Sequence, residues 1–277
     1  MIKTEILICG YGNIGRYMFE ELCPLIYSDN STIRITIYDP VDKKDEVFCG
    51  EHLDFVNDID TIKKMSFDAC FICVPTDKLA DGSADTTKVQ WCLDNINSSI
   101  YVIKSTIPLE FVKTIEDNDS IVHCPEYWGT TAHSDTTQNF MILGGAREAC
   151  NKIYELYAKM KNGSFKYIFT TMRAAAIAKY MENCWIATKV TFCNDFAELA
   201  RTWGVNYEDV RQCFITDDRV SPSHTYAFED QPYYDSHCLN KDIPAIIADS
   251  DKQFGDRNLL PLVKAVNNIN DKRKLGL

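Results

Sequence analysis

The segment "YYDSHCLNKD", from Tyr233 to Asp242, places a cysteine, a lysine and an aspartate within five positions. A cysteine thiolate is a strong nucleophile at neutral pH, so Cys238 is a candidate for covalent catalysis. The alternative is a structural role, because the chain has 12 cysteines and most of them lie in apolar segments, where a buried thiol acts as a small apolar side chain.

A second candidate pair lies in "AKYMEN", where Lys179 and Asn183 are four residues apart. This spacing puts both side chains on one face of a helix. There an ammonium group and an amide could stabilise a developing alkoxide or oxyanion. Cationic charge close to Cys238 would also lower the pKa of its thiol. Alternatively, Lys179 simply extends from an apolar face to water.

The segment "ICGYGNIGRYM" follows an expected strand and opens an expected helix. Gly10, Gly12 and Gly15 give the pattern Gly-x-Gly-x-x-Gly, with Asn13 and Ile14 in the turn. Such glycines allow a tight turn, a close approach of the backbone to a pyrophosphate and close packing of helix on strand. The helix N-terminus then faces the phosphates.

Asp39 ends the next expected strand, "ITIYDP", just over twenty residues after the glycines. A carboxylate at this place hydrogen-bonds the ribose hydroxyls of a dinucleotide and repels a 2′-phosphate. The pattern therefore predicts NAD rather than NADP as cofactor. A glycine-rich turn beside a capping aspartate is the simpler alternative.

Composition limits the class of protein. The 277 residues are 45% hydrophobic, carry a formal charge of −11 and give a pI near 4.9. This acidity disfavours nucleic acid as a partner and leaves no polybasic membrane patch. No apolar run approaches the ~20 residues that span a bilayer, and no signal peptide is recognisable, so we expect a cytoplasmic protein.

We expect the cysteines to be reduced, because the chain is far larger than domains stapled by disulfides. Cys70 and Cys73 form a Cys-x-x-Cys pattern in "FDACFICVP", but this segment is typical of a buried strand. No second pair of ligands stands at the spacing of a zinc site, so no metal is predicted.

The first part of the chain alternates strands and helices. Continuous apolar strands separated by helices predict a parallel sheet covered on both faces, which is a Rossmann-like doubly wound α/β fold. This domain is expected over residues 1–170. The expected strands are "EILICG", "IRITIYD", "FDACFICVP", "IYVIKST", "SIVHCPE" and "NFMILGG", and the expected helices are "NIGRYMFEELCPLI", "TTKVQWCLDNI" and "LEFVKTIED".

A small helical domain is expected over residues 171–277. Residues 171–204 contain no internal proline or glycine before Gly204, a natural C-terminal cap, and predict a helix of ~45 Å. So long an apolar helix connects two lobes or forms a dimer interface, and we expect a homodimer. Shorter helices are expected at "YEDVRQCFI", "IPAIIADSDKQF" and "LLPLVKAVNNIND", with an irregular stretch over residues 217–237.

Several of these segments resemble the UDP-glucose/GDP-mannose dehydrogenase family, in the family's order along nearly the whole chain. "FICVPTDKLADGSAD" resembles its Val-Pro-Thr segment with a following Gly-x-x-Asp, and "VIKSTIP" its Lys-Ser-Thr-x-Pro. "PEYW" resembles its Pro-Glu-Phe, and the helix with Lys179 and Asn183 its central helix. "DDRV" is similar to its Asp-x-Arg-Ile, and "CLNKD" to its Cys-x-x-Lys-Asp.

The resemblance implies an enzyme that oxidises the C6 alcohol of a nucleotide sugar to a carboxylate with two NAD, through a thiohemiacetal and a thioester on Cys238. It implies that Lys179 and Asn183 stabilise the oxyanion, that Asp242 and Thr106 orient water or accept a proton, and that Glu126 is a base for thioester hydrolysis. Otherwise Asp242 is a charge at a helix N-terminus, and Thr106 and Glu126 are ordinary loop residues.

The resemblance also implies further binding residues. The substrate would be bound by Lys179, Asn183 and Arg219, the last reaching the neighbouring subunit, although Arg219 after two aspartates also fits a surface ion pair. Beyond the glycine turn and Asp39, the cofactor would contact Val74, Pro75, Thr76, Ser105, Thr106 and Glu126.

Three features depart from the family pattern. The stretch "AFEDQPYYDSHC" lacks the glycine-rich loop that wraps the substrate's diphosphate, so backbone amides are not freed there. A second glutamate after the Pro-Glu-Phe segment is missing. The sequence also lacks the family's C-terminal nucleotide-sugar-binding domain, so the chain is expected to be a shortened member. These losses affect substrate binding more than chemistry, and another chain could supply the missing domain.

Two other functions remain open. One is a two-electron dehydrogenase of the β-hydroxyacid or 6-phosphogluconate type, in which Lys179 is the acid and base and Cys238 is incidental. The other is a non-catalytic dinucleotide-binding protein. In each enzyme the substrate is a small molecule, either a sugar nucleotide or a smaller hydroxy compound.

Overall fold

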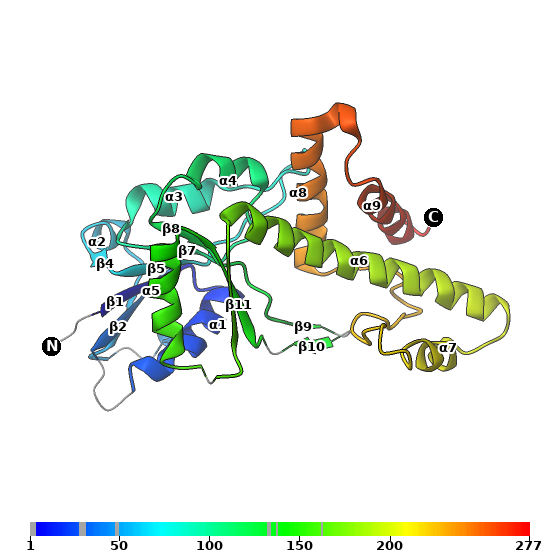
Figure 1. Ribbon diagram of the computed structural model, residues 1–277, viewed down its shortest axis with the longest axis horizontal. Coiled ribbons are helices and arrows are strands. Elements are labelled where there is room, and N and C mark those ends of the chain that lie inside the picture. Colours follow the sequence, from blue (N-terminus) through cyan, green and yellow to red (C-terminus); the bar gives the residue numbers. More distant parts are fainter. Residues whose placement is uncertain (1–3, 28–31, 48–49, 132–133, 137, 162) are drawn as a thin grey trace. The chain divides into compact units, whose positions relative to one another are not determined.

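The computed structural model describes residues 4–27, 32–47, 50–131, 134–136, 138–161 and 163–277 (Figure 1). The chain divides into two compact units. Unit 1 contains residues 1–77, 85–126 and 138–177, and unit 2 contains residues 78–84, 127–137 and 178–277. The division between them falls inside one long helix, α6 (Met172–Thr202).

Unit 1 is built on an eight-stranded sheet with the strand order β12-β11-β8-β7-β5-β1-β2-β3. This arrangement confirms the predicted doubly wound, Rossmann-like fold. The strands are β1 (Thr4–Cys9), β2 (Ile33–Tyr38), β3 (Leu53–Val56), β5 (Ala69–Ile72), β7 (Tyr101–Ile103), β8 (Ile121–His123), β11 (Phe140–Gly145) and β12 (Lys166–Thr170).

Both faces of this sheet are buried, as the continuous apolar strands predict. Along β1, Ile6 and Ile8 pack into one core and Leu7 and Cys9 into the other. The first core is covered by α1 (Asn13–Leu22) and α5 (Arg147–Ala158). The second is covered by α2 (Ile59–Ile62), α3 (Thr87–Asn95), α4 (Leu109–Ile115) and the start of α6. A short parallel pair, β4 (Ser66–Phe67) and β6 (Asn97–Ser98), completes the unit.

Two predictions about this sheet need correction. β11 pairs antiparallel with β8, although the pattern predicted parallel strands. Residues 124–139 contain no helix among those described, and a parallel neighbour would need a crossover connection. The sequence analysis also missed β3, β12 and α5. β12 lies at the sheet edge and is partly exposed, so it lacks a continuous apolar run.

Unit 2 is mainly helical. It contains most of α6, then α7 (Tyr207–Phe214), α8 (His237–Phe254) and α9 (Pro261–Lys274), with a two-stranded sheet of β9 (Gly129–Thr131) and β10 (Ser134–Thr136). Its core joins α6, α8 and α9 through Ala187, Val190, Leu239, Ile243 and Val266. As predicted, α6 is unbroken: it runs to Thr202, and the chain then turns at Gly204, which has a φ of +67°.

α8 begins six residues earlier than the pattern predicted. Its N-cap is Ser236, whose hydroxyl accepts a hydrogen bond of 3.2 Å from the N–H of Leu239. Polar residues over 237–242 masked the apolar periodicity, so the sequence pattern placed this turn in the preceding loop. As a consequence, Cys238 lies in the first turn of the helix.

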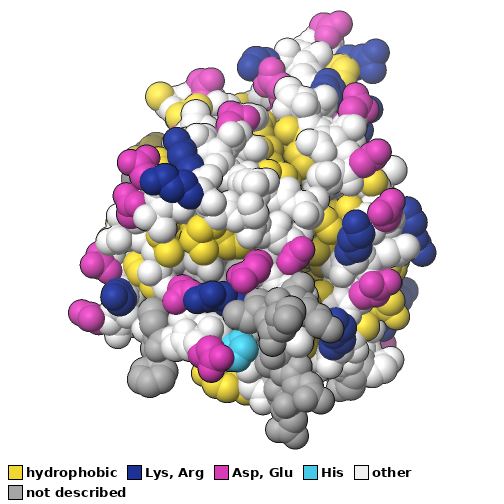
Figure 2. All heavy atoms as spheres, turned by 90° about the vertical axis from the view of Figure 1, so that its left-hand side faces the viewer, with side chains coloured by type: hydrophobic (Ala, Val, Ile, Leu, Met, Phe, Trp, Pro, Cys, Tyr) yellow, Lys and Arg dark blue, Asp and Glu magenta, His cyan; other side chains and the backbone are white. Residues whose placement is uncertain are grey.

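Acidic and basic side chains are interspersed over the face of the molecule shown in Figure 2, with apolar side chains between them. Among the described residues, no helix is long and apolar enough to cross a membrane.

One buried side chain makes the stability of unit 1 depend on pH. His123 at the end of β8 is fully buried, and its Nε2 lies 3.3 Å from the carbonyl oxygen of Ser105. Burial lowers the pKa of His123 from 6.5 to about 4. The folded protein therefore keeps this ring neutral at pH values where the unfolded chain already binds a proton.

We expect the stability that neutral His123 provides to be fully present above pH 6.5 and to be lost as the pH falls to about 4. The loss amounts to about 3 kcal/mol, because a pKa difference of one corresponds to about 1.4 kcal/mol. Urea unfolding of the wild type and His123→Asn between pH 4 and 7 measures it. If the unfolding free energies of the two proteins changed equally with pH, His123 would not be the cause of this pH dependence.

Candidate active site

The predicted glycine-rich turn joins β1 to α1. Gly10 has a φ of +93°, and a Cβ atom there would lie 2.9 Å from the carbonyl oxygen of Cys73. A Cβ atom on Gly15 would lie 1.9 Å from the carbonyl oxygen of Gly10. Both positions therefore require glycine, and together they hold the start of α1 against the ends of the strands.

Gly12 meets a different environment. A Cβ atom at Gly12 would have no heavy atom within 4 Å, so the turn is open at this point. Gly12 is the N-cap of α1 and has no side chain to occupy the N–H groups of the first turn, which begins with Asn13 and Ile14. Open space before free helical N–H groups fits the pyrophosphate of a dinucleotide.

Asp39 lies next to this turn, directly after β2. Its carboxylate accepts hydrogen bonds from the N–H groups of Tyr11 at 2.7 Å and Val41 at 2.9 Å, and from Nζ of Lys43 at 2.9 Å. Burial works to raise the pKa of Asp39, but the hydrogen bonds from Lys43 and the two N–H groups lower it overall. The ionised carboxylate fits the ribose-binding role expected for it.

The loops that follow β5 and β7 are joined to each other. The hydroxyl of Thr76 donates to the carbonyl oxygen of Thr106 at 2.9 Å, and the hydroxyl of Ser105 donates to the carbonyl oxygen of Val74 at 2.6 Å. Pro75 lies between Val74 and Thr76 in the chain. These predicted cofactor residues therefore meet at the carboxyl edge of the parallel strands, where doubly wound folds bind ligands.

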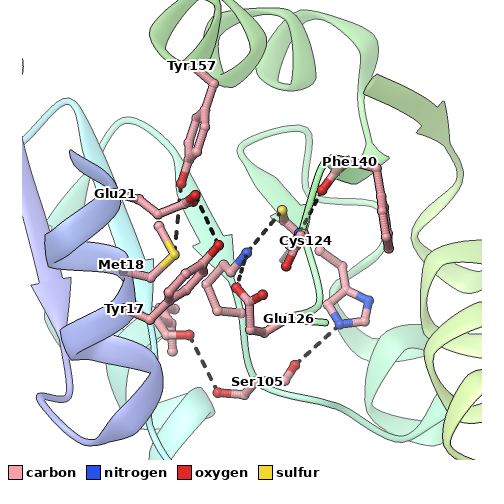
Figure 3. A network of polar contacts seen from close by, with 12 residues as sticks. Tyr17, Met18, Glu21, Ser105, Cys124, Glu126, Phe140 and Tyr157 are labelled. Carbon is pink, nitrogen blue, oxygen red and sulfur yellow. Dashed lines mark hydrogen bonds and ion pairs between the residues drawn. The ribbon is translucent and has the colours of Figure 1, made fainter. Parts of the chain in front are cut away.

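Glu126 belongs to a buried polar network in unit 1, shown in Figure 3. Its Oε2 lies 3.0 Å from Nζ of Lys104, and both side chains are at most 5% exposed. Nζ of Lys104 also lies 3.5 Å from Sγ of Cys124. Burial alone would lower the pKa of Lys104, but Cys124 and Glu126 raise it overall, so Lys104 remains an ammonium group. The expected base, Glu126, is thus ion-paired within its own unit.

The two glycines give a matched pair of variants. Gly15→Ala forces a Cβ atom onto the backbone of Gly10, so we expect a loss of more than about 2 kcal/mol in unfolding free energy. Gly12→Ala adds its methyl group to open space. Its unfolding free energy should fall by less than about 1 kcal/mol, because only the N-cap residue of α1 changes. The same methyl group should weaken NAD binding at least about tenfold by blocking the pyrophosphate.

Chemical denaturation and calorimetric titration with NAD measure these two effects separately. Unchanged NAD affinity in Gly12→Ala would exclude this turn as the pyrophosphate site.

In unit 2, a buried carboxylate joins α6 to α8. Nδ2 of Asn183 donates to Oδ2 of Asp242 at 2.7 Å, and both residues are at most 3% exposed. Nζ of Lys241 donates to Oδ1 of Asp242 at 2.6 Å, so each oxygen of this carboxylate has a donor. The sequence analysis placed Asn183 and Asp242 in one site, and the structure brings these two into direct contact.

Cys238 lies one turn before Asp242 on α8, and the two share a helix face. Cys238 and Cys213 are exposed, whereas the other described cysteines are buried or partly buried, and all of them are free thiols. Cys238 is therefore accessible to a reactant in this chain.

Nearby cations lower the pKa of Cys238, as expected, but burial and Asp242 outweigh them, so the pKa of this thiol is raised overall. The surrounding protein atoms withdraw water and raise its pKa, and Asp242 raises it further, while Lys241 and Lys179 lower it and Glu182 raises it. Each cation near the thiol is paired with a carboxylate, so their charges largely offset each other.

Lys179 makes an ion pair and a ring contact that the sequence pattern did not predict. Its Nζ donates to Oε2 of Glu182 at 2.6 Å and lies 4.5 Å from the centre of the Tyr127 ring. The Lys179 side chain is only 10% exposed. It therefore does not extend freely to water, which was the alternative interpretation.

Arg219 lies on the surface of unit 2, and its side chain is 89% exposed. It forms a two-pronged ion pair with Asp217, in which Nε donates at 2.9 Å and Nη2 at 2.5 Å. Within this chain Arg219 makes the surface pair that the sequence left as an alternative. Exposed pairs of this kind contribute little to stability.

The sequence analysis assigned no role to four charged side chains that are paired in the structure: Lys43, Lys104, Glu182 and Lys241. Glu182 follows Lys179 by three residues, a spacing that brings side chains together on a helix, whereas Lys43 lies in the irregular stretch after β2, where this rule does not apply. Lys104 ends an otherwise apolar strand, so its burial also requires a partner. These signals were available in the sequence.

Two family models match this chain in order. Residues 31–161 match the NAD binding domain of the UDP-glucose/GDP-mannose dehydrogenase family, and residues 173–272 match the family's central domain. The chain belongs to the UDP-glucose/GDP-mannose dehydrogenase family. Other members are NAD-dependent dehydrogenases, and unit 1 contains the family's NAD-binding domain.

Similar family members include two bacterial enzymes named UDP-glucose 6-dehydrogenase. The Pseudomonas aeruginosa protein is 28% identical over 218 residues, covering 71% of this chain and 48% of the relative. The Campylobacter jejuni protein is 27% identical over 98% of this chain and 72% of its own length. The chain spans about half the length of the Pseudomonas relative.

Solved structures of the family share the fold. A UDP-glucose dehydrogenase from Pyrobaculum islandicum superposes with a TM-score of 0.75 at 19% identity, covering 97% of this chain and 68% of that one. A GDP-mannose dehydrogenase from Pseudomonas aeruginosa gives a TM-score of 0.62 at 19% identity, covering 96% of this chain and 68% of that one.

Proposed function

We propose that this family member is an NAD-dependent dehydrogenase that oxidises a primary alcohol of a sugar, in the first instance the C6 alcohol of a nucleotide sugar, to a carboxylate. The observation that carries the proposal is the arrangement in unit 2. An accessible cysteine stands one helical turn from a buried aspartate, and that aspartate binds the asparagine which follows Lys179 on α6.

The proposed chemistry assigns one task to each side chain. In the first step the alcohol loses a hydride and a proton, and Lys179 and Asn183 stabilise the oxygen as charge develops. The sulfur of Cys238 then adds to the aldehyde carbon to form a thiohemiacetal. Loss of a second hydride and proton gives a thioester. Water then cleaves the C–S bond, which restores the thiol and releases the carboxylate.

Bound NAD supplies the hydride acceptor in both oxidation steps. We assign its binding to the turn from Gly10 to Gly15, Asp39, Val74, Pro75, Thr76, Ser105, Thr106 and Glu126. Asp242 and Thr106 would orient water or accept protons, and Glu126 would serve thioester hydrolysis, with Lys104 holding its carboxylate. Free cysteines fit a reducing compartment, so we propose a cytoplasmic enzyme.

The covalent scheme makes a prediction about stoichiometry. The wild type should release two NADH per molecule of UDP-sugar or GDP-sugar consumed. Cys238→Ser should lose turnover to carboxylate by at least about a thousandfold, because a serine hydroxyl stays protonated at neutral pH and is then a far poorer nucleophile than a thiolate. Absorbance at the NADH band, calibrated against product measured by mass spectrometry, gives the ratio.

Cys213→Ser is the matched control, because Cys213 is also exposed and lies on α7 rather than α8. A ratio of one NADH per substrate, with full turnover in Cys238→Ser, would replace the covalent scheme by a two-electron dehydrogenase.

We also propose that the enzyme is a homodimer joined along α6. The helix carries an exposed apolar stripe whose members recur every three, four or seven residues: Met181, Trp185, Phe192, Phe196, Leu199 and Trp203. Met181 is 72% exposed and Trp203 78%, values that are unusual for side chains of this size. The stripe is ~33 Å long at 1.5 Å per residue. A second copy of the helix would bury it, and Arg219 could then contact the partner.

A charged residue placed in the apolar stripe tests the proposed dimer. Trp185→Glu should weaken the dimer at least about a hundredfold, because a buried unpaired charge is strongly destabilising in an apolar interface. Sedimentation velocity over a range of concentrations measures the dissociation constant. Arg201→Glu, on the opposite side of α6 at 100° per residue, should leave it unchanged. A wild-type protein that sediments as a monomer throughout would exclude the dimer.

A further inference from the structure

The pairing of Lys179 in unit 2 has a consequence for the reactivity of Cys238. Lys179 shares a face of α6 with Asn183, and Asn183 contacts Asp242, which shares a face of α8 with Cys238, so the ammonium group lies on the side of α6 that meets this part of α8. Lys179 is also bound to Glu182 and lies against the ring of Tyr127. An ammonium group that donates to a carboxylate stabilises a neighbouring thiolate less than a free one, because the two charges oppose each other at the sulfur.

The charges around Cys238 come from two helices. α8, which carries Cys238, contributes Asp242 and Lys241, and α6 contributes Lys179 and Glu182. Asp242 and Lys241 pair at 2.6 Å, as do Lys179 and Glu182. The α8 pair is buried, since Asp242 is 3% exposed and also held by Asn183. The α6 pair is not, because the side chain of Glu182 is 34% exposed.

This difference decides which pair can change. Breaking the Asp242–Lys241 pair would leave a buried carboxylate short of a donor, at a large cost in free energy. Glu182 can leave Lys179 and be solvated at once, because its carboxylate already reaches water. A substrate oxygen that takes the ammonium group of Lys179 needs only to displace or share this exposed carboxylate.

We propose that Glu182 is a positioning residue which acts through Lys179: it holds the ammonium group and offsets its charge, so that Cys238 stays a thiol until an oxygen of the substrate displaces the Glu182 carboxylate. The thiol would thereby be protected from unwanted alkylation or oxidation in the free protein. The inference concerns the same site as the proposed function, but its first consequence, the chemistry of the free thiol, needs neither substrate nor cofactor.

The test is the rate at which iodoacetamide alkylates Cys238 in the intact 277-residue chain, from pH 6 to 10. The thiolate forms a C–S bond to the reagent and iodide leaves, so the rate follows the thiolate fraction. Peptide mass spectrometry separates Cys238 from Cys213, which is also exposed.

Glu182→Gln should alkylate about two- to threefold faster than the wild type at pH 7.5, with the midpoint of its pH profile shifted down. The gain is modest because a thiolate of lower pKa is also less nucleophilic. Glu182→Asp, which keeps the carboxylate, should remain close to the wild type. Glu198→Gln is the matched control, an equal loss of charge on an exposed residue of α6, ~24 Å further along the helix.

A double-mutant cycle with Lys179→Met shows whether Glu182 acts through the lysine. In the Lys179→Met background the effect of Glu182→Gln should shrink by at least half. Unchanged melting temperatures check that each variant is folded. Coincident profiles for Glu182→Gln and the wild type would overturn the proposal. Equal effects of Glu182→Gln with and without Lys179 would also overturn it, since Glu182 would then act only by its own charge.

The test does not depend on the proposed reaction. Should the protein fail to oxidise any sugar nucleotide while the alkylation profiles shift as expected, the inference would stand and the proposed function would fall. Should turnover be found with unshifted profiles, the reverse would hold.

Discussion

The carboxylate of Asp242 is the constraint on which the candidate chemistry of unit 2 depends. It is buried, so both of its oxygens need donors, and Asn183 from α6 and Lys241 from α8 supply them. These bonds hold the faces of the two helices together at the point where Lys179 and Cys238 lie. Removing one donor would leave a buried charge incompletely paired, which is costly enough to fix the geometry.

Electrostatic balance follows from the same constraint. Asp242 lies one helical turn from Cys238, and its negative charge raises the pKa of that thiol. The cations needed for an oxyanion are present, but in the free chain each is bound to a carboxylate. In the proposed scheme, a nucleophile that becomes reactive only when a substrate rearranges these pairs would be protected from side reactions in the free protein.

In unit 1, the sheet and its covering helices hold the glycine-rich turn in place. Apolar residues on both faces of β1 fix the strand between two helical layers, and Gly10 and Gly15 let α1 approach its end. The hydroxyl groups of Thr76 and Ser105 join the next two loops along the sheet edge. In the segments that follow β7 and β8, Lys104 and Glu126 add a buried cation and anion that pair with each other.

The sequence by itself determined the fold of unit 1, the glycine turn with Asp39, the long helix ending at Gly204 and the family. These features rest on local patterns: apolar runs, glycine spacing and short ordered motifs. Only the tertiary structure decided the direction of β11, the start of α8 before Cys238, the contact between Asn183 and Asp242 and the pairing of Glu126 with Lys104. Those outcomes depend on which groups meet after folding and lose water together. The pKa of Cys238 therefore depends on its burial and on the charges paired around it, and the amino-acid sequence alone gives neither.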